Sequence, residues 1–280
     1  MLYNEEMNYF FRLTFKVLVF IFAFIGLFLV LGYIAMRLKL TNAYGIIDEQ
    51  TKNFIQVPNG TKKYETFPLA HSPEWIAFRI AVLKDKTIIE KVSKETGVPA
   101  RILVALLVPE QMRLFNSNRA LFKQVFEPLK VLGRQSQFSW GIFGIKDETA
   151  RAIENHLQDN KSPFYLGQSF EHTLLFKTTD IDQERFQRII DEHDHTYSYL
   201  YTALYVAQIN KQWEKAGFPI KNRPEILATL FNIGFEKSIP NTNPKSGGST
   251  LDINGIEYSF GTIAKSFYDS DEMIEIFPQK

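Results

Sequence analysis

Twenty consecutive residues without a charge, from Val17 to Met36, constrain this chain more than any other feature. An α-helix rises about 1.5 Å per residue, so a helix of this length matches the roughly 30 Å hydrocarbon core of a bilayer. A segment inside a bilayer must bond all its backbone groups internally, which favours one spanning helix. The sequence therefore predicts a transmembrane anchor near the N-terminus.

A cleaved signal peptide and a buried core helix are the alternatives to this anchor. The apolar part of a signal peptide usually spans about 7–15 residues and ends at small residues, whereas this longer run is followed by Arg37 and Lys39. A core helix normally has a polar face, which this segment lacks. The flanking charges do not orient the anchor, because Arg12 and Lys16 on one side balance the two basic residues on the other.

Composition limits the classes of function that the chain can have. The net charge is +1 and the isoelectric point is near 7.8, which does not indicate a nucleic-acid-binding protein. Cysteine is absent, so disulfides, thiolate metal sites and a cysteine nucleophile are excluded. We expect no cofactor. We also expect no metal site, because His193 and His195 are two residues apart on a predicted helix and would point away from each other.

The sequence divides into three parts. Residues 1–38 comprise a short tail and the anchor, and residues 39–72, which include Pro58 and Pro68, predict a stalk with a short strand at 53–57. Residues 73–280 predict one mainly α-helical domain with a small β-hairpin.

Local signals place the elements of this domain. Ser72 and Pro73 are typical of a helix start, and the first helical region reaches Gly97 with a break near 84–87. Pro99 opens the next helix, ARILVALLVPEQM, which is apolar almost all round and therefore predicted to be buried. We expect the remaining elements to be helices at 147–156, 182–216 and 224–234 and a hairpin at 251–260 that turns at Asn254-Gly255.

Glu110 lies at the C-terminal end of the predicted buried helix. Burial and the negative end of the helix dipole both disfavour a charged carboxylate. A carboxylic acid that stays protonated near neutral pH is what a general acid requires. The alternative is that Glu110 simply reaches the surface where the helix leaves the core.

Two later segments follow the Glu110 helix in a recognisable order: SWGIFGIKDETA at 139–150 and LATLFNIG at 227–234. Together the three segments resemble the lysozyme-like family of soluble lytic transglycosylases and goose-type lysozymes, over roughly residues 85–270. In that family a helix ends in the catalytic Glu, a Gly-Leu-Met-Gln-Ile-x-Pro-x-Thr-Ala stretch follows, and Ala-Tyr-Asn-Ala-Gly comes later. The resemblance implies a lysozyme-like fold for residues 73–280.

The resemblance also implies a peptidoglycan-cleaving activity, that of a lytic transglycosylase or a muramidase. In the family the Glu protonates the oxygen between N-acetylmuramic acid and N-acetylglucosamine, then accepts a proton from the sugar's 6-hydroxyl or from water. One carboxylate thus serves where most glycosidases need two. Glu110 matches this catalytic residue. The implied substrate-binding positions are Gln111, Trp140, Gly141, Ile142, Phe143, Gly144, Ile145, Phe231 and Asn232.

The chain departs from the family pattern near the implied site. Gln111 stands where Ser or Thr usually follows the Glu, Gly144 stands where the family has Gln, and Pro109 removes one helix hydrogen bond. These differences support a second hypothesis, in which a degenerate lysozyme-like module binds glycan strands or an envelope protein without cleaving.

Peptidoglycan lies outside the cytoplasm, so the activity implies a topology. We expect a single-pass protein of the bacterial cytoplasmic (inner) membrane whose C-terminal domain is periplasmic, with glycan strands and the membrane as partners and no nucleic acid. The tyrosines at 197, 199, 201 and 205 are predicted to be core, with a saccharide platform as the alternative. Asp147 and Glu148 are predicted to stabilise a helix start rather than to supply a second catalytic carboxylate.

Overall fold

The computed structural model describes residues 15–20, 22–23, 67–116, 141–253 and 255–279. The chain divides into two units, 1–61 and 62–280. In the first unit, residues 15–20 and 22–23 are helical with exposed side chains. Among the described residues, no helix is both long and apolar enough to cross a membrane. Most of the predicted anchor and stalk, including the strand at 53–57, lies outside the described residues.

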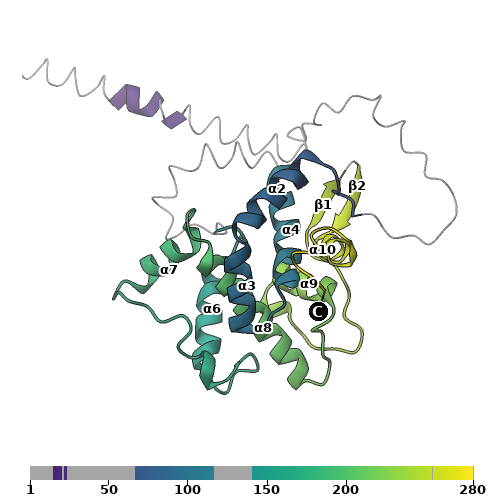
Figure 1. Ribbon diagram of the computed structural model, residues 1–280. Coiled ribbons are helices and arrows are strands. Elements are labelled where there is room, and N and C mark those ends of the chain that lie inside the picture. The colour runs from purple at the N-terminus through teal and green to yellow at the C-terminus, as the bar shows by residue number, and fades with distance from the viewer. Residues whose placement is uncertain (1–14, 21, 24–66, 117–140, 254, 280) are drawn as a thin grey trace, which may run out of the picture. The chain divides into compact units, whose positions relative to one another are not determined.

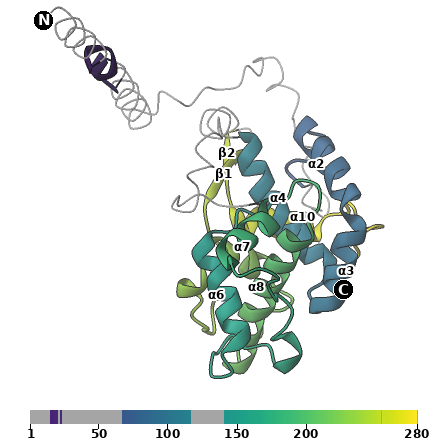
Figure 2. The same cartoon turned by 90° about the vertical axis from the view of Figure 1, so that its left-hand side faces the viewer.

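The second unit is mainly α-helical with one two-stranded antiparallel sheet, as the sequence predicts (Figure 1). Its helices are α2 (Pro73–Lys84), α3 (Lys86–Thr96), α4 (Ala100–Asn116), α6 (Asp147–Gln158), α7 (Ile181–Ile190), α8 (Thr196–Lys215), α9 (Pro224–Ile233) and α10 (Phe260–Asp269), with 3₁₀ turns η3 (Gln168–Phe170) and η4 (Phe235–Lys237), and its strands are β1 (Thr250–Ile253) and β2 (Ile256–Ser259). The helices α6 and α7 face the viewer in Figure 2, and α2 and α3 lie at the right-hand edge of that view.

The first predicted helical region has the expected start, break and end. Ser72 Oγ accepts a hydrogen bond from the backbone N–H of Trp75 at 3.0 Å, which caps α2. The break falls at Asp85, between α2 and α3. Gly97 ends α3 with a φ of +73°, a left-handed conformation that glycine adopts without steric cost. Phe67 and Leu69, which precede α2, are buried in the same core.

The apolar helix α4 forms the centre of the domain and packs against α2, α3, α8, α9 and α10. Its residues from Ile102 to Val108 are all buried, which confirms the prediction from its composition. The helix continues through Pro109 to Asn116, so the predicted end near Met112 was wrong. Glu110 therefore lies within α4 rather than at its end.

Arg101, near the start of α4, is fully buried and binds the C-terminal part of the chain. Its five N–H groups donate to the backbone carbonyl oxygens of Phe267, Tyr268, Ser270, Glu272 and Phe277 at 2.6–3.0 Å. Burial lowers the pKa of the Arg101 guanidinium from its usual value. Two of these carbonyls belong to the last turn of α10, where carbonyl groups lack the usual partners of a helix interior. Arg101 thus joins α4 to the end of the domain.

The predicted helix over 182–216 is two helices, α7 and α8, joined by residues 191–195. Asp191 Oδ1 accepts hydrogen bonds from the backbone N–H groups of His193 and Asp194 at 2.8 and 3.0 Å. Asp194 Oδ1 then accepts from Thr196 N–H, at the start of α8. Such local side-chain bonds compete with helical hydrogen bonds. His193 and His195 therefore lie in a loop and not on the predicted helix.

The C-terminal part contains the predicted hairpin and a helix that was not predicted. Ile253 pairs with Ile256, which leaves a two-residue turn, and Gly255 in this turn has a φ of +80°. Helix α10 follows at once, capped by Ser259 Oγ, which accepts from Thr262 N–H at 3.1 Å. The buried side of α10 packs against α4 and α9.

Candidate functional site

Glu110 is 4% exposed and lies one helical turn from Arg113 on α4. The Nη2 atom of Arg113 is 2.6 Å from Glu110 Oε1, so the two residues form an ion pair. Glu110 thus does not simply reach the surface where the helix leaves the core. Arg113 was not singled out in the sequence, although its spacing of three residues is the signal for such a pair.

Gln111, next to Glu110, joins α4 to the second motif. Its Nε2 donates a hydrogen bond to the backbone carbonyl oxygen of Ile142. Within the motif, Gly144 N–H donates to the Gly141 carbonyl oxygen at 3.3 Å. Gly141 and Gly144 have φ values of +67° and +62°, in the left-handed region that favours glycine. The glycine at 144 therefore suits the turn that lies beside α4.

Phe143 joins the second motif to the third. Its ring is buried and makes edge-to-face contacts with Tyr199 on α8, at a centroid distance of 5.1 Å, and with Phe231 on α9, at 6.2 Å. The helices α4 and α9 also pack together. The three sequence segments, which lie as far apart as Glu110 and Leu227, therefore meet in the folded domain.

The predicted substrate-binding residues separate into buried and partly accessible groups. Phe143, Ile145 and Phe231 are buried, and Phe231 contacts the rings of Tyr205 and Phe260 in addition to Phe143. Asn232 is partly accessible, and its Oδ1 accepts a hydrogen bond from Ser249 N–H at 2.8 Å. The other partly accessible positions are Gln111, Gly141, Ile142 and Gly144. Trp140 lies outside the described residues.

Gly141 is packed tightly against α7 and α8. A Cβ atom at this position would overlap the Ile189 carbonyl oxygen and Ser198 Oγ, which are themselves hydrogen bonded at 2.8 Å. We expect Gly141→Ala to lower the free energy of unfolding by about 1–2 kcal/mol from left-handed strain and by a further 1–3 kcal/mol from overpacking.

Gly97 is the matched control for this substitution. It has a φ of +73° and nothing within 4 Å of an added Cβ, so Gly97→Ala should incur the backbone strain alone. Chemical denaturation of the two variants measures the difference. Equal losses of stability would contradict the close approach at Gly141.

An ionic network on α6 and α7 lies next to the second motif. Arg185 is buried and forms ion pairs with Glu154 at 2.6 Å and with Asp182 at 2.8 Å. Asp147, the first residue of α6, pairs with Arg151 at 2.7 Å. Hydrogen bonds from Arg151 and Arg185 lower the pKa of Asp182 to about 2. Asp147 and Glu148 thus begin a helix as predicted, and the contacts of Asp147 connect α6 to the network.

The tyrosines of α8 are largely core residues, as predicted. Tyr199, Tyr201 and Tyr205 are buried, while Tyr197 is partly buried. The hydroxyl of Tyr199 donates to Asp85 at 3.1 Å and that of Tyr201 to Glu154 at 2.6 Å. Burial, together with the nearby Asp85 carboxylate, raises the pKa of Tyr199 well above its usual value. The Tyr199 ring packs against Phe143, and the three buried rings do not form an exposed platform.

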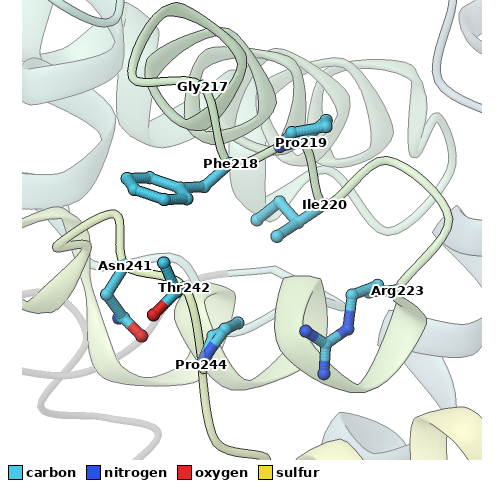
Figure 3. Close-up of a pocket in the computed structure, with 8 residues that line it drawn as sticks. All are labelled: Gly217, Phe218, Pro219, Ile220, Arg223, Asn241, Thr242 and Pro244. Carbon is cyan, nitrogen blue, oxygen red and sulfur yellow. The ribbon is translucent and has the colours of Figure 1, made fainter.

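An open pocket of about 270 Å³ lies elsewhere, between the end of α8 and the start of α9 (Figure 3). It is lined by Gly217, Phe218, Pro219, Ile220, Arg223, Asn241, Thr242 and Pro244. Its one charged residue, Arg223, pairs with Glu225 at 2.9 Å. The lining contains no carboxylate or nucleophile suited to bond cleavage, so we assign no chemistry to this pocket.

No protein-family model, curated protein or solved structure matches the chain. Within the described ranges, no three His, Asp or Glu side chains gather closely enough to hold a metal ion. The candidate site therefore rests on the motifs and on the contacts that bring them together.

Proposed function

We propose that this chain is a membrane-anchored, peptidoglycan-cleaving enzyme of the lysozyme-like type. Glu110 acts as its single general acid and base on the bond between N-acetylmuramic acid and N-acetylglucosamine. One observation supports the proposal: the three motif segments meet at the Glu110 helix, because Gln111 binds Ile142 and Phe143 contacts Phe231.

The chemistry requires two proton transfers, both of which involve Glu110. Glu110 first donates a proton to the glycosidic oxygen as the bond from that oxygen to the anomeric carbon breaks. The carboxylate then takes a proton from the sugar's own 6-hydroxyl, which closes an anhydro ring, or from water, which leaves a reducing end. No second carboxylate is needed, and Asp147 is paired with Arg151.

Arg113 sets a condition on this mechanism. A guanidinium 2.6 Å from the carboxylate stabilises its ionised form, whereas a general acid must be protonated. The proposal therefore requires that the saccharide separates Arg113 from Glu110 as it binds. The partly accessible residues Gln111, Ile142 and Asn232 are the candidates for contact with the sugars.

The same ion pair favours a second candidate function. A buried carboxylate that stays paired with Arg113 cannot donate a proton, and the left-handed Gly144 offers no side-chain amide to the substrate. The second candidate is a lysozyme-like module that binds glycan strands or an envelope protein without cleaving them.

Incubating the purified full-length chain in detergent with peptidoglycan separates the two candidates. We expect soluble muropeptides to accumulate with time and in proportion to the amount of protein. Retention of the chain on sedimented peptidoglycan without any release would support the binding module and contradict the enzyme.

The proposed location has its own test. A reporter fused after Lys280 should be active only outside the cytoplasm, because the glycan substrate lies there. A cytoplasmic C-terminus would contradict cleavage of peptidoglycan by this domain.

A further inference from the structure

Helix α2 is apolar on two faces. Trp75, Phe78 and Val82 are buried in the domain core. On the other side, three large apolar residues are exposed: Ile76 is 54%, Ile80 55% and Leu83 42% exposed. Their spacing of four and three residues places them in one stripe, because each helical residue advances by about 100°. The exposed residues Ala77 and Ala81 lie next to this stripe.

Single exposed apolar residues are common on soluble proteins, but a continuous stripe indicates an interaction surface. The helix lies at the edge of the domain, as the right-hand side of Figure 2 shows. We define the α2 stripe as Ile76, Ile80 and Leu83.

Basic residues flank the α2 stripe on both sides. At about 100° per residue, Arg79 lies on one side of the stripe and Lys84 on the other, and both are exposed. Lys86 follows at the start of α3. Asp85, between Lys84 and Lys86, is turned into the domain, where it contacts His195 at 2.7 Å and accepts a hydrogen bond from Tyr199. Arg79 forms an ion pair with Glu272 at 3.8 Å, and Lys86 forms one with Glu90 at 3.7 Å. Exposed ion pairs of this kind contribute only about 0–1 kcal/mol, so these basic side chains remain available to an anionic partner.

We propose that the α2 stripe lies in the surface of an anionic lipid bilayer. Interfacial helices insert an apolar face between lipid headgroups while basic residues at its borders contact phosphate. Position in the chain supports this occupant, because only 36 residues separate Met36, the end of the uncharged run, from Pro73. A tether of this length raises the effective concentration of the surface at the membrane, so a small stripe is sufficient.

This inference rests on the proposed membrane anchor but not on cleavage of peptidoglycan. Binding of α2 to a membrane would also affect the orientation of the candidate site, because α2 packs against α4, which contains Glu110. A bilayer that holds α2 would therefore also fix the direction in which the Glu110 helix points.

Because the chain has no cysteine, a single introduced cysteine can be labelled specifically. Ile80→Cys in the full-length chain provides a single site for an environment-sensitive fluorophore. Lys161→Cys, at an exposed position after α6, is the matched control. Each labelled chain is reconstituted into vesicles of phosphatidylglycerol and phosphatidylcholine, with and without lipids that carry a quencher near the headgroup. Flotation first establishes that the chain is in the bilayer.

Interfacial helices bury their apolar face about 5–10 Å into the boundary between the headgroups and the acyl chains. We therefore expect emission from position 80 to shift to the blue and to be quenched several times more strongly than emission from position 161. Arg79→Gln combined with Lys84→Gln should weaken the quenching at position 80, as should vesicles of phosphatidylcholine alone.

The remaining outcomes overturn the proposal in distinguishable ways. A chain that fails to float would contradict both the membrane anchor and the proposal for the α2 stripe. Flotation with equal, weak quenching at both positions would leave the anchor in place and reject the surface. A blue shift at position 80 without lipid quenching would mean that protein covers the stripe, either from this chain or from a second copy. Peptidoglycan cleavage is assayed separately in detergent, so its loss would not affect these readouts.

Discussion

Glu110→Gln should reduce muropeptide release by about 10²–10⁴-fold, the usual contribution of a general acid. Glutamine keeps the size of the side chain and its capacity for hydrogen bonds, but it cannot donate the acid proton. Rates of release from peptidoglycan, corrected for the folded fraction of each preparation, give the measurement. Binding to sedimented peptidoglycan should remain close to that of the unaltered chain.

Glu154→Gln provides the matched control for this substitution. Glu154 is also a largely buried carboxylate in an ion pair with an arginine, but it belongs to the network on α6 and α7. The Glu154→Gln variant should be less stable, but each folded molecule should release muropeptides at the unaltered rate. If Glu110→Gln cleaves as fast as Glu154→Gln, Glu110 is not the general acid.

Arg101→Met should have the largest effect on stability. Methionine fills much of the same volume but leaves five carbonyl oxygens without the guanidinium that now binds them. A buried hydrogen-bonding group that loses its partner typically costs about 1–3 kcal/mol, so the loss of several such bonds should total about 3–5 kcal/mol. We expect a loss of this size in guanidinium denaturation of the full-length chain, with release of the segment after α10 detectable by limited proteolysis.

Arg223→Met is the control, because the Arg223 side chain is 43% exposed and pairs with one carboxylate. Exposed ion pairs contribute about 0–1 kcal/mol, so its stability should change little. Similar losses in the two variants would mean that the hydrogen bonds of Arg101 do not hold the C-terminal segment.

The sequence predicted those elements whose signals are local. Ser72 as a helix cap, Gly97 as a helix end and Asn254-Gly255 as a hairpin turn each depend on neighbouring residues alone. Two features that differ from the prediction also have local signals. Asp191 and Asp194 cap backbone N–H groups between α7 and α8, and Ser259 caps α10.

Other features depend on contacts between distant segments, which the hydrophobic periodicity of the sequence does not predict. The burial of Arg101 results from carbonyl groups more than 160 residues away in the chain. The site is similar in this respect, because the contact between Phe143 and Phe231 is tertiary. The motifs indicated that these segments belong together, but not that Phe231 would be buried or that Arg113 would pair with Glu110.

Mass spectrometry of the products released from peptidoglycan tests the central proposal most directly. The full-length chain should release muropeptides that end in N-acetylmuramic acid, either as the anhydro form, if the 6-hydroxyl supplies the second proton, or as the reducing form, if water supplies it. Glu110→Gln should release neither. Products that end in N-acetylglucosamine, or that differ only by cleaved peptide bonds, would contradict the account, as would the absence of any product from a folded chain that binds peptidoglycan.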